Sequence, residues 1–234
     1  MISVQIRGNE VFIPREGRKS FLPNTSLKDL SIVKCIDFAK EMAYGEGFHN
    51  AKAFAGSSYT RENKEIFINT LQGKIAELGF YNLMYARGMT PDKLPDFRIW
   101  GKGIWEDCDF EFKNGTIKVS LKSTKHFGNL LLLEKNRYNA NGEYLEPANG
   151  QTPVKHDYIF LSRVKGVDSY NPSDYATPFK INCEITGFIT HDLFKELIHK
   201  NKYIKKGTRL GIPLIVDNYY IVASDLYPIE DFII

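Results

Sequence analysis

The chain has 234 residues, of which 43% are hydrophobic and 25% charged, and its formal net charge is +3. This length suits one well-filled domain, and the composition is typical of a soluble globular protein. Because no apolar run approaches the roughly 20 residues that a membrane-spanning helix needs, we expect no membrane partner.

The cysteines favour a reducing compartment. Cys35, Cys108 and Cys183 are an odd number, lie far apart and include no Cys-x-x-Cys pair, which argues against a disulfide framework or a zinc knuckle. The first residues lack the basic start and long apolar core of a signal peptide, so the expected location is the cytoplasm. The charge total is only weak evidence on nucleic-acid binding, because a basic groove and an acidic catalytic centre cancel in the sum.

Two amphipathic helices are predicted in the first part of the chain. Asn24-Thr25-Ser26 reads as the cap of a helix that runs to about Ala43, and a longer helix is expected from about Glu62 to Ala86. Two glycines inside this second helix, at 73 and 79, cost about 1 kcal/mol each relative to alanine, which suggests a close approach to the hairpin or to a nucleic-acid backbone.

The rest of the chain predicts strands, one hairpin and one more helix. Short strands are expected at 97–100, 158–164, 185–189 and 218–223, a hairpin at 107–124, and a helix from Thr190 as N-cap to about Lys200. This order predicts a mixed α/β or α+β domain.

The hairpin carries the most informative pattern. Asn114-Gly115 is a strong two-residue turn, since both central positions of a type I′ turn need positive φ. Counting outward from it, Asp109 lies opposite Ser120, and Asp107 lies opposite Lys122. Because side chains alternate along a strand, one face is apolar and the other brings two carboxylates close to a lysine.

Such a face suits metal-assisted phosphodiester hydrolysis. Mg²⁺ prefers carboxylate and carbonyl oxygens, and it can polarise a phosphate, while a lysine can orient the attacking water or neutralise developing charge. The alternative is an ordinary solvent-facing surface with mixed charges. A third carboxylate, Glu77, flanks the apolar stripe of the second helix, and the alternative for it is a surface pair with Lys74.

Together these residues resemble the PD-(D/E)XK nuclease superfamily, and the arrangement is most similar to type II restriction endonucleases. The resemblance covers about residues 62–124: a Gly-Lys-Ile-Ala-Glu helix, then Pro95-Asp96-Phe97, an acidic strand, and Val119-Ser-Leu-Lys-Ser-Thr124. It implies a restriction-endonuclease-like core with a central mixed β-sheet flanked by helices. It also implies a single nuclease domain over residues 1–234, with an N-terminal helical extension at about 1–60, a catalytic core at about 62–234 and a DNA-recognition insert near 125–157.

The resemblance also implies roles for individual residues. Asp109, with Asp107 as the close alternative, matches the motif aspartate, Lys122 matches the motif lysine, and Glu77 matches a helix-borne glutamate that some members use. Asp109, Glu77, the backbone carbonyl of Leu121 and Asp107 would then hold Mg²⁺. The acidic residue two positions before the lysine is replaced by Ser120, a departure that leaves the second metal ligand open. Asp96 matches the letters of the motif but comes one strand too early.

The segment after the hairpin is the best candidate for contacts with DNA, because Asn and Arg pair with base edges and Lys with phosphates. Its candidate residues are Lys125, Asn129, Lys135, Asn136, Arg137, Tyr138 and Asn139. The alternative is that Asn-Gly pairs simply make turns, and this is the preferred interpretation for Asn141 and Asn149 of the same segment. A second basic cluster at 202–209 reads equally well as a phosphate contact or a solvated helix end.

The expected function is therefore a Mg²⁺-dependent endonuclease that cuts double-stranded DNA at a short sequence. A homodimer is expected if the site is palindromic, and a restriction role implies a partner DNA methyltransferase in the host. Two alternatives remain: a structure-selective nuclease of repair or junction resolution, and a DNA-binding protein on the same fold that has lost catalysis.

Overall fold

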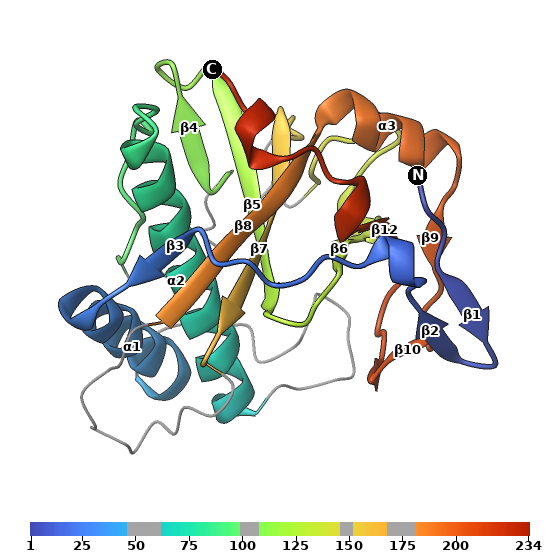
Figure 1. Cartoon of the computed structure of the whole chain (residues 1–234), viewed down its shortest axis with the longest axis horizontal. Helices are drawn as coiled ribbons and strands as arrows, with labels where there is room; N and C mark the ends of the chain where they lie inside the picture. Colours follow the sequence, from blue (N-terminus) through green and yellow to red (C-terminus); the bar gives the residue numbers. More distant parts are fainter. Residues whose placement is uncertain (46–61, 99–107, 146–151, 168–180) are drawn as a thin grey trace.

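The fold is known from a computed structural model, which describes residues 1–45, 62–98, 108–145, 152–167 and 181–234. A five-stranded mixed sheet lies at its centre, with strand order β3-β8-β7-β5-β4 (Figure 1). These strands are β3 (Thr25–Leu27), β8 (Ile181–Thr190), β7 (Tyr158–Lys165), β5 (Ile117–Lys125) and β4 (Phe110–Phe112). Only β5 and β7 run parallel, and the other neighbours are antiparallel.

Two smaller sheets complete the strands that the structure describes. One has the order β6-β12-β9 and the other β1-β2-β10-β11. The first consists of β6 (Leu130–Glu134), β12 (Asn218–Val222) and β9 (Tyr203–Ile204). The second consists of β1 (Gln5–Arg7), β2 (Glu10–Phe12), β10 (Arg209–Leu210) and β11 (Ile212–Pro213).

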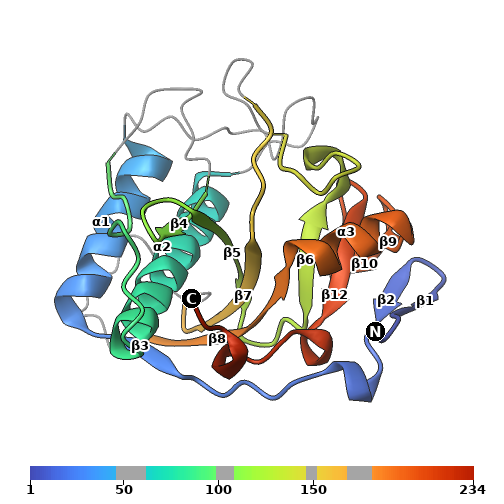
Figure 2. The ribbon, with the colours of Figure 1, turned by 90° about the horizontal axis from the view of Figure 1, so that it is seen from above.

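The two faces of the five-stranded sheet are covered differently, one by helices alone and the other by the β6-β12-β9 sheet and a helix (Figure 2). On one face lie α1 (Asp29–Tyr44) and α2 (Asn63–Ala86), and on the other lie β6, β12 and α3 (His191–His199). Four 3₁₀ turns accompany these elements: η1 (Arg15–Gly17), η2 (Lys135–Arg137), η3 (Ala223–Asp225) and η4 (Ile229–Asp231).

Each face of the sheet has its own hydrophobic core. Val119 and Leu121 of β5 pack in the core beneath α1 and α2. On the other face, Ile159 and Leu161 of β7 pack against β6, β12 and α3. Because side chains alternate along a strand, the even-numbered residues of β5 (118, 120 and 122) point away from the α1–α2 layer.

Most of the longer predicted elements are confirmed. The helix expected at about 62–86 is α2, and Gly88 follows it with a φ of +76°, as a C-terminal glycine should. The buried strand expected at 158–164 is β7, and Thr190 caps α3 by accepting a hydrogen bond from the amide of Leu193 at 3.3 Å.

The predicted start of the first helix is wrong. Residues 25–27 form strand β3, and α1 begins at Asp29. The reason is tertiary: the Asn24 side chain donates to the carbonyl of Ile185 and accepts from its amide, which fastens this segment to β8 as a sheet edge. The expected helical extension at about 1–60 thus holds one described helix and three short strands, of which β3 belongs to the main sheet. Phe97 and Arg98 are not in a strand, and 99–100 lie outside the described residues.

The glycines of α2 differ in what surrounds them. A Cβ at Gly79 would lie 3.0 Å from Cys183 Sγ and 3.1 Å from Thr25 Cγ2, whereas a Cβ at Gly73 would meet nothing within 4 Å. The close approach predicted at both glycines is therefore found only at Gly79, and its nearest neighbours lie on β8 and β3 instead of the hairpin. This glycine lets α2 pack tightly on the sheet.

The described part of the chain is a mixed α/β fold with three helices. Among these helices, none is both long and apolar enough to cross a membrane.

Candidate active site

The hairpin forms in the predicted register. Phe110 pairs with Val119 and Phe112 with Ile117, and both Asn114 and Gly115 have positive φ, at 56° and 77°. The pairing stops before residue 109, whose amide bonds to the carbonyl of Val119 at 3.0 Å. Because β4 begins only at Phe110, the edge of β5 beyond Val119 is not paired with β4 and can be contacted by side chains.

Asp109 fills this opening with its carboxylate. Its Oδ2 accepts a hydrogen bond from the Leu121 amide at 2.6 Å and another from Ser120 Oγ at 3.1 Å. An amide and a carbonyl of one residue point to the same edge of a strand, so the Leu121 carbonyl lies on the Asp109 side of β5. The resemblance described above implies a carboxylate and a main-chain oxygen close together at this position.

Lys122 lies on the face of β5 that points away from α1 and α2. It lines a pocket of about 170 Å³ between the five-stranded sheet and the β6-β12-β9 sheet. The pocket is lined by Lys122, Leu132, Leu133, Glu134, Arg137, Tyr138 and Tyr144. The Lys122 ammonium lies 6.0 Å from the centre of the Tyr144 ring. Within the described part of the chain Lys122 forms no ion pair, whereas Glu134 and Arg137 of the same pocket pair with each other.

The other polar groups of this pocket are held by one another. Glu134 pairs with the guanidinium of Arg137, which also donates to the hydroxyl of Tyr144 at 3.1 Å. Burial, together with Tyr144 and the carboxylate of Asp109, raises the pKa of the Tyr138 phenol, which stays protonated at neutral pH. The pocket thus presents a carboxylate, two cations and two phenols to anything that enters it.

The structure does not bring Glu77 to this pocket. Glu77 pairs with Lys74 at 2.6 Å on α2, the helix that covers the opposite face of the sheet. The contact of Gln72 with Ser123 at 3.2 Å marks the face of β5 that α2 covers, and Lys122 lies on the other. Asp107 lies outside the described residues, and Asp96 pairs with Arg98 at 2.9 Å.

Several candidate DNA contacts are engaged within the fold. Asn129 accepts from the amide of Lys19 at 2.8 Å and donates to the carbonyl of Phe127 at 3.1 Å. Asn139 accepts from the amides of residues 141 and 143 and so holds its own turn. Tyr138 is buried in the core between the sheets. A contact with a DNA base would break these hydrogen bonds or expose this buried ring. The proposed DNA interface therefore does not include these side chains.

The remaining candidates are spread over the surface. Lys135 donates to Asn201 at 3.1 Å and lies 3.8 Å from the centre of the Tyr203 ring, on β9 of the β6-β12-β9 sheet. Lys125 and Asn136 are exposed. Arg137 lines the pocket of Lys122, where it pairs with Glu134.

Two residues of the pocket, Glu134 and Tyr144, were missed by the sequence analysis. The run Leu130–Leu133 between Asn129 and Glu134 is a short apolar segment typical of a buried strand, and it forms β6. Recognising it would have placed Glu134 at a strand end. Nothing in the sequence signals the position of Tyr144, because it depends on isolated bridges to Tyr138 and Val154.

The donors fit Mg²⁺ bound mainly by substrate and water. No group of three metal-ligating side chains is found among the described residues. Mg²⁺ commonly uses one or two carboxylates together with waters and phosphate oxygens, and such a set needs no all-protein cage. Both bonds to Asp109 use Oδ2, so Oδ1 remains for a cation.

The comparisons with known proteins give no family: no protein-family model, no curated protein and no solved structure matches this chain. The chemistry of the pocket therefore rests on its own residues.

Proposed function

We propose that this chain is a Mg²⁺-dependent endonuclease that hydrolyses phosphodiester bonds of double-stranded DNA at a short sequence. The observation that carries the proposal is the contact of the Asp109 carboxylate with the Leu121 amide, next to a lysine without an ion pair among the described residues. A carboxylate and a main-chain carbonyl then lie on one edge of β5, and the lysine is the next residue along the strand, in the order that the resemblance to PD-(D/E)XK nucleases implies.

Each residue has a distinct task in this proposal. Asp109 and the Leu121 carbonyl would hold Mg²⁺, which when bound supplies a Lewis acid for the phosphate. Lys122 holds the attacking water in place and offsets negative charge as it develops on the phosphate oxygens. The Leu121 amide and Ser120 hydroxyl keep the Asp109 carboxylate oriented.

The second carboxylate comes from β6 in this proposal. Glu134 lines the pocket of Lys122, whereas Glu77 lies with α2 on the opposite face of the sheet. We therefore assign to Glu134 the role that the sequence analysis gave to Glu77.

Digestion of a long mixed-sequence DNA in Mg²⁺, followed by sequencing of the fragment ends, tests the proposal. Wild type should give discrete fragments that share one short motif. Lys122→Ala should give none while it still binds DNA in Ca²⁺. The matched control, Lys28→Ala, removes an exposed lysine at the start of α1 and should cut like wild type. Cleavage by Lys122→Ala at the wild-type rate would rule out the assigned role.

Two further variants separate the carboxylates. Glu134→Gln should lower the cleavage rate at least about 100-fold, since even the outer partners of metal ligands are worth 10–100-fold. Glu77→Gln should cut within a few-fold of wild type. The reverse result would return the second ligand to α2.

A protein that binds DNA without cutting it is the second candidate, and Ser120 favours it. Ser120 is buried and bonds to Asp109 where the family motif has an acid. Binding of duplex DNA without cleavage in either Mg²⁺ or Mn²⁺ would support this candidate. Cleavage confined to branched DNA would instead support a structure-selective nuclease.

A further inference from the structure

The β6-β12-β9 sheet brings distant parts of the chain together at one of its ends. Asn218, the first residue of β12, pairs with Glu134 of β6 on one side and with Ile204 of β9 on the other. Neighbouring strands lie about 4.8 Å apart, so the backbones of Glu134 and Ile204 are about 10 Å apart. Because Glu134 lines the pocket of Lys122, the loop that follows β9 begins close to the proposed catalytic pocket.

Basic side chains gather at this end of the sheet. Lys205 and Lys206 follow β9 directly, are exposed, and form no ion pair with any residue that the structure describes. Lys135 follows β6 directly, and its ammonium contacts two neutral groups: Asn201 Oδ1 at 3.1 Å, and the Tyr203 ring at 3.8 Å from its centre. Three lysines thus keep an uncancelled charge beside the pocket.

The acids at this end do not offset the charge of the three lysines. The segments that meet there contain two, Glu134 and Asp217. Glu134 pairs with Arg137, and Asp217 accepts a hydrogen bond from the backbone amide of Lys206 at 2.8 Å. Neither carboxylate is bonded to one of the three ammonium groups, and with Arg137 there are four cations for two carboxylates.

Backbone hydrogen bonds hold the loop that carries Lys205 and Lys206. The amide of Gly207 donates to the carbonyl of Leu214 at 2.8 Å, and the amide of Thr208 donates to the carbonyl of Lys205 at 3.2 Å. Gly207 has a φ of +85°, which favours glycine at this turn. The backbone beneath the two lysines is therefore already ordered, so binding a ligand there costs less conformational entropy than ordering a free tail.

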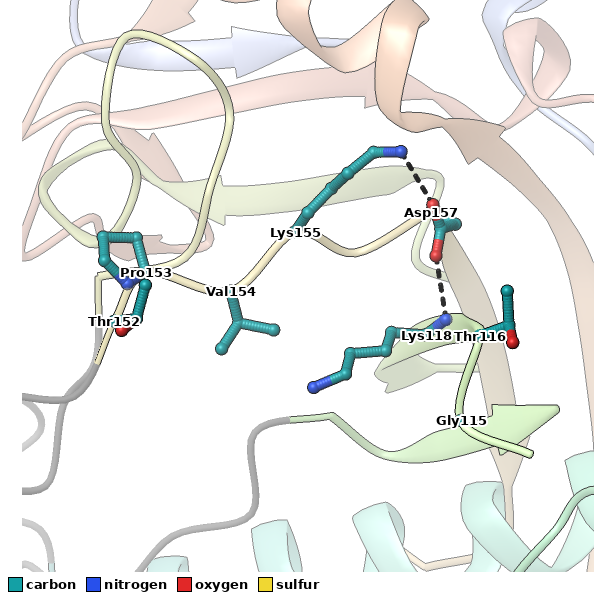
Figure 3. Close-up of a pocket in the computed structure, with 8 residues that line it drawn as sticks. All are labelled: Gly115, Thr116, Lys118, Thr152, Pro153, Val154, Lys155 and Asp157. Carbon is teal, nitrogen blue, oxygen red and sulfur yellow. Dashed lines mark hydrogen bonds and ion pairs between the residues drawn. The ribbon is translucent and has the colours of Figure 1, made fainter. Parts of the chain in front are cut away.

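The larger pocket beside the hairpin turn does not offer a comparable charge. This pocket, of about 570 Å³, has Lys118, Lys155 and Asp157 among its lining residues (Figure 3). Lys155 Nζ bonds to Asp157 at 2.8 Å, and the ammonium groups of the two lysines point in different directions (Figure 3). We therefore assign no anion to it.

We propose that Lys135, Lys205 and Lys206 bind backbone phosphates of the DNA that flanks the cleavage site. One strand of DNA rises about 3.4 Å per nucleotide, so the 10 Å or so between the ends of β6 and β9 correspond to about three nucleotides. A lysine ammonium is a point charge that suits a phosphate, and such a contact reads no bases. This inference rests on the proposed function for its ligand, and it adds a site that fixes the position of the duplex.

The dependence of DNA affinity on salt tests this inference. The experiment measures fluorescence anisotropy of a labelled duplex of about 30 base pairs in Ca²⁺ over a range of KCl concentrations. Each neutralised phosphate contributes about 0.9 to the slope of log K against log salt, so Lys205→Ala/Lys206→Ala should lose roughly 1.8 units. Raising KCl from about 50 to 200 mM should then weaken this variant about 12-fold less than wild type. Lys135→Gln should lose about 0.9 units.

Matched variants show whether charge at this end of the sheet is the cause. Lys28→Ala/Lys64→Ala removes two exposed lysines from the α1–α2 side and should keep the wild-type slope. Lys205→Arg/Lys206→Arg keeps both charges and should restore most of the slope that the alanines remove. The loss should be equal on two duplexes of unrelated sequence, and a loss confined to one of them would contradict a phosphate contact. An alanine variant with the wild-type slope would overturn the inference and leave Lys205 and Lys206 as solvated surface residues.

The two proposals fail in different ways. If wild type cuts DNA and the alanine variant binds with the wild-type slope, the phosphate site is wrong and the nuclease stands. If wild type binds DNA without cutting it and the variant loses slope, the phosphate site stands on the DNA-binding alternative. If wild type neither binds nor cuts duplex DNA, both proposals fall.

Discussion

A buried ion pair between β7 and β8 offers the sharpest test of how the sheet is held to the N-terminal segment. The side chains of Arg163 and Glu184 are 0% and 7% exposed, and Arg163 Nη2 lies 2.7 Å from both carboxylate oxygens. The same guanidinium donates to the carbonyls of Lys19 and Ser20, and Glu184 accepts from the amide of Leu22. One charge pair thus fastens residues 19–22 across two strands of the sheet.

Glu184→Gln removes the negative charge with little change of shape. It leaves the Arg163 cation buried without its counter-charge, and breaking one partner of a buried pair costs about 3–5 kcal/mol. For a domain of this size about 2–4 °C of Tm accompanies each kcal/mol, so the melting temperature should fall by roughly 6–20 °C. The double variant Arg163→Met/Glu184→Leu should recover at least half of this loss, because it leaves no uncompensated charge.

Urea unfolding followed by circular dichroism, together with thermal scans, measures these differences. The matched control is Glu196→Gln, which breaks the exposed pair of Glu196 with Lys200 at 3.2 Å and should cost less than about 0.5 kcal/mol. A loss below about 1 kcal/mol in Glu184→Gln would show that the buried pair is dispensable. A double variant less stable than Glu184→Gln would show that the hydrogen bonds to residues 19–22 matter more than the charges.

Two other predictions concern packing and thiols. Gly79→Ala should destabilise the protein by about 1–3 kcal/mol, because the added Cβ would crowd β8. Gly73→Ala, in open space on the same helix, should stabilise it by up to about 1 kcal/mol. Urea unfolding measures both free energies, and equal effects would contradict the close approach of α2 to the sheet. Burial raises the pKa of Cys35 and of Cys183 to about 12, so at pH 8 iodoacetamide should label the folded protein at the half-buried Cys108 alone and the unfolded protein at all three. Mass spectrometry counts the adducts, and rapid labelling of either buried thiol in the folded state would refute this reasoning.

The sequence patterns succeeded where structure is local. The turn at Asn114-Gly115 sets the register of the hairpin through its own backbone conformation, so the pairing of Phe110 with Val119 followed from counting. The apolar period of α2 and the cap at Thr190 are likewise local signals. Asp109 and Ser120 came out as neighbours for the same reason.

The patterns failed where position depends on distant partners. Residues 25–27 carry a helix cap in sequence but form a strand, because Asn24 bonds to the backbone of β8. Glu77 lies in the predicted helix, yet the face that this helix presents to the sheet is set by tertiary packing. Glu134 reaches the pocket through the β6-β12-β9 sheet, whose pairing joins residues 130–134 to 218–222, a separation that no periodicity can reveal. Tyr144 reaches it through isolated bridges to Tyr138 and Val154.

The pocket of Lys122 has walls from two sheets that share no strand pairing among the described residues. Lys122 stands on β5, while Glu134 ends β6, and β6 is held in place by β12 along its whole length. The distance across the pocket is therefore set by the apolar layer between the sheets, where Leu133, Ile159 and Ile221 meet. Cavities in this layer should change reaction rates without touching a polar residue, because misplacing reacting groups by about 1 Å can cost 100-fold in rate. Strand β12 thus supports from behind the pocket in which we propose catalysis, although it follows the hairpin by about a hundred residues.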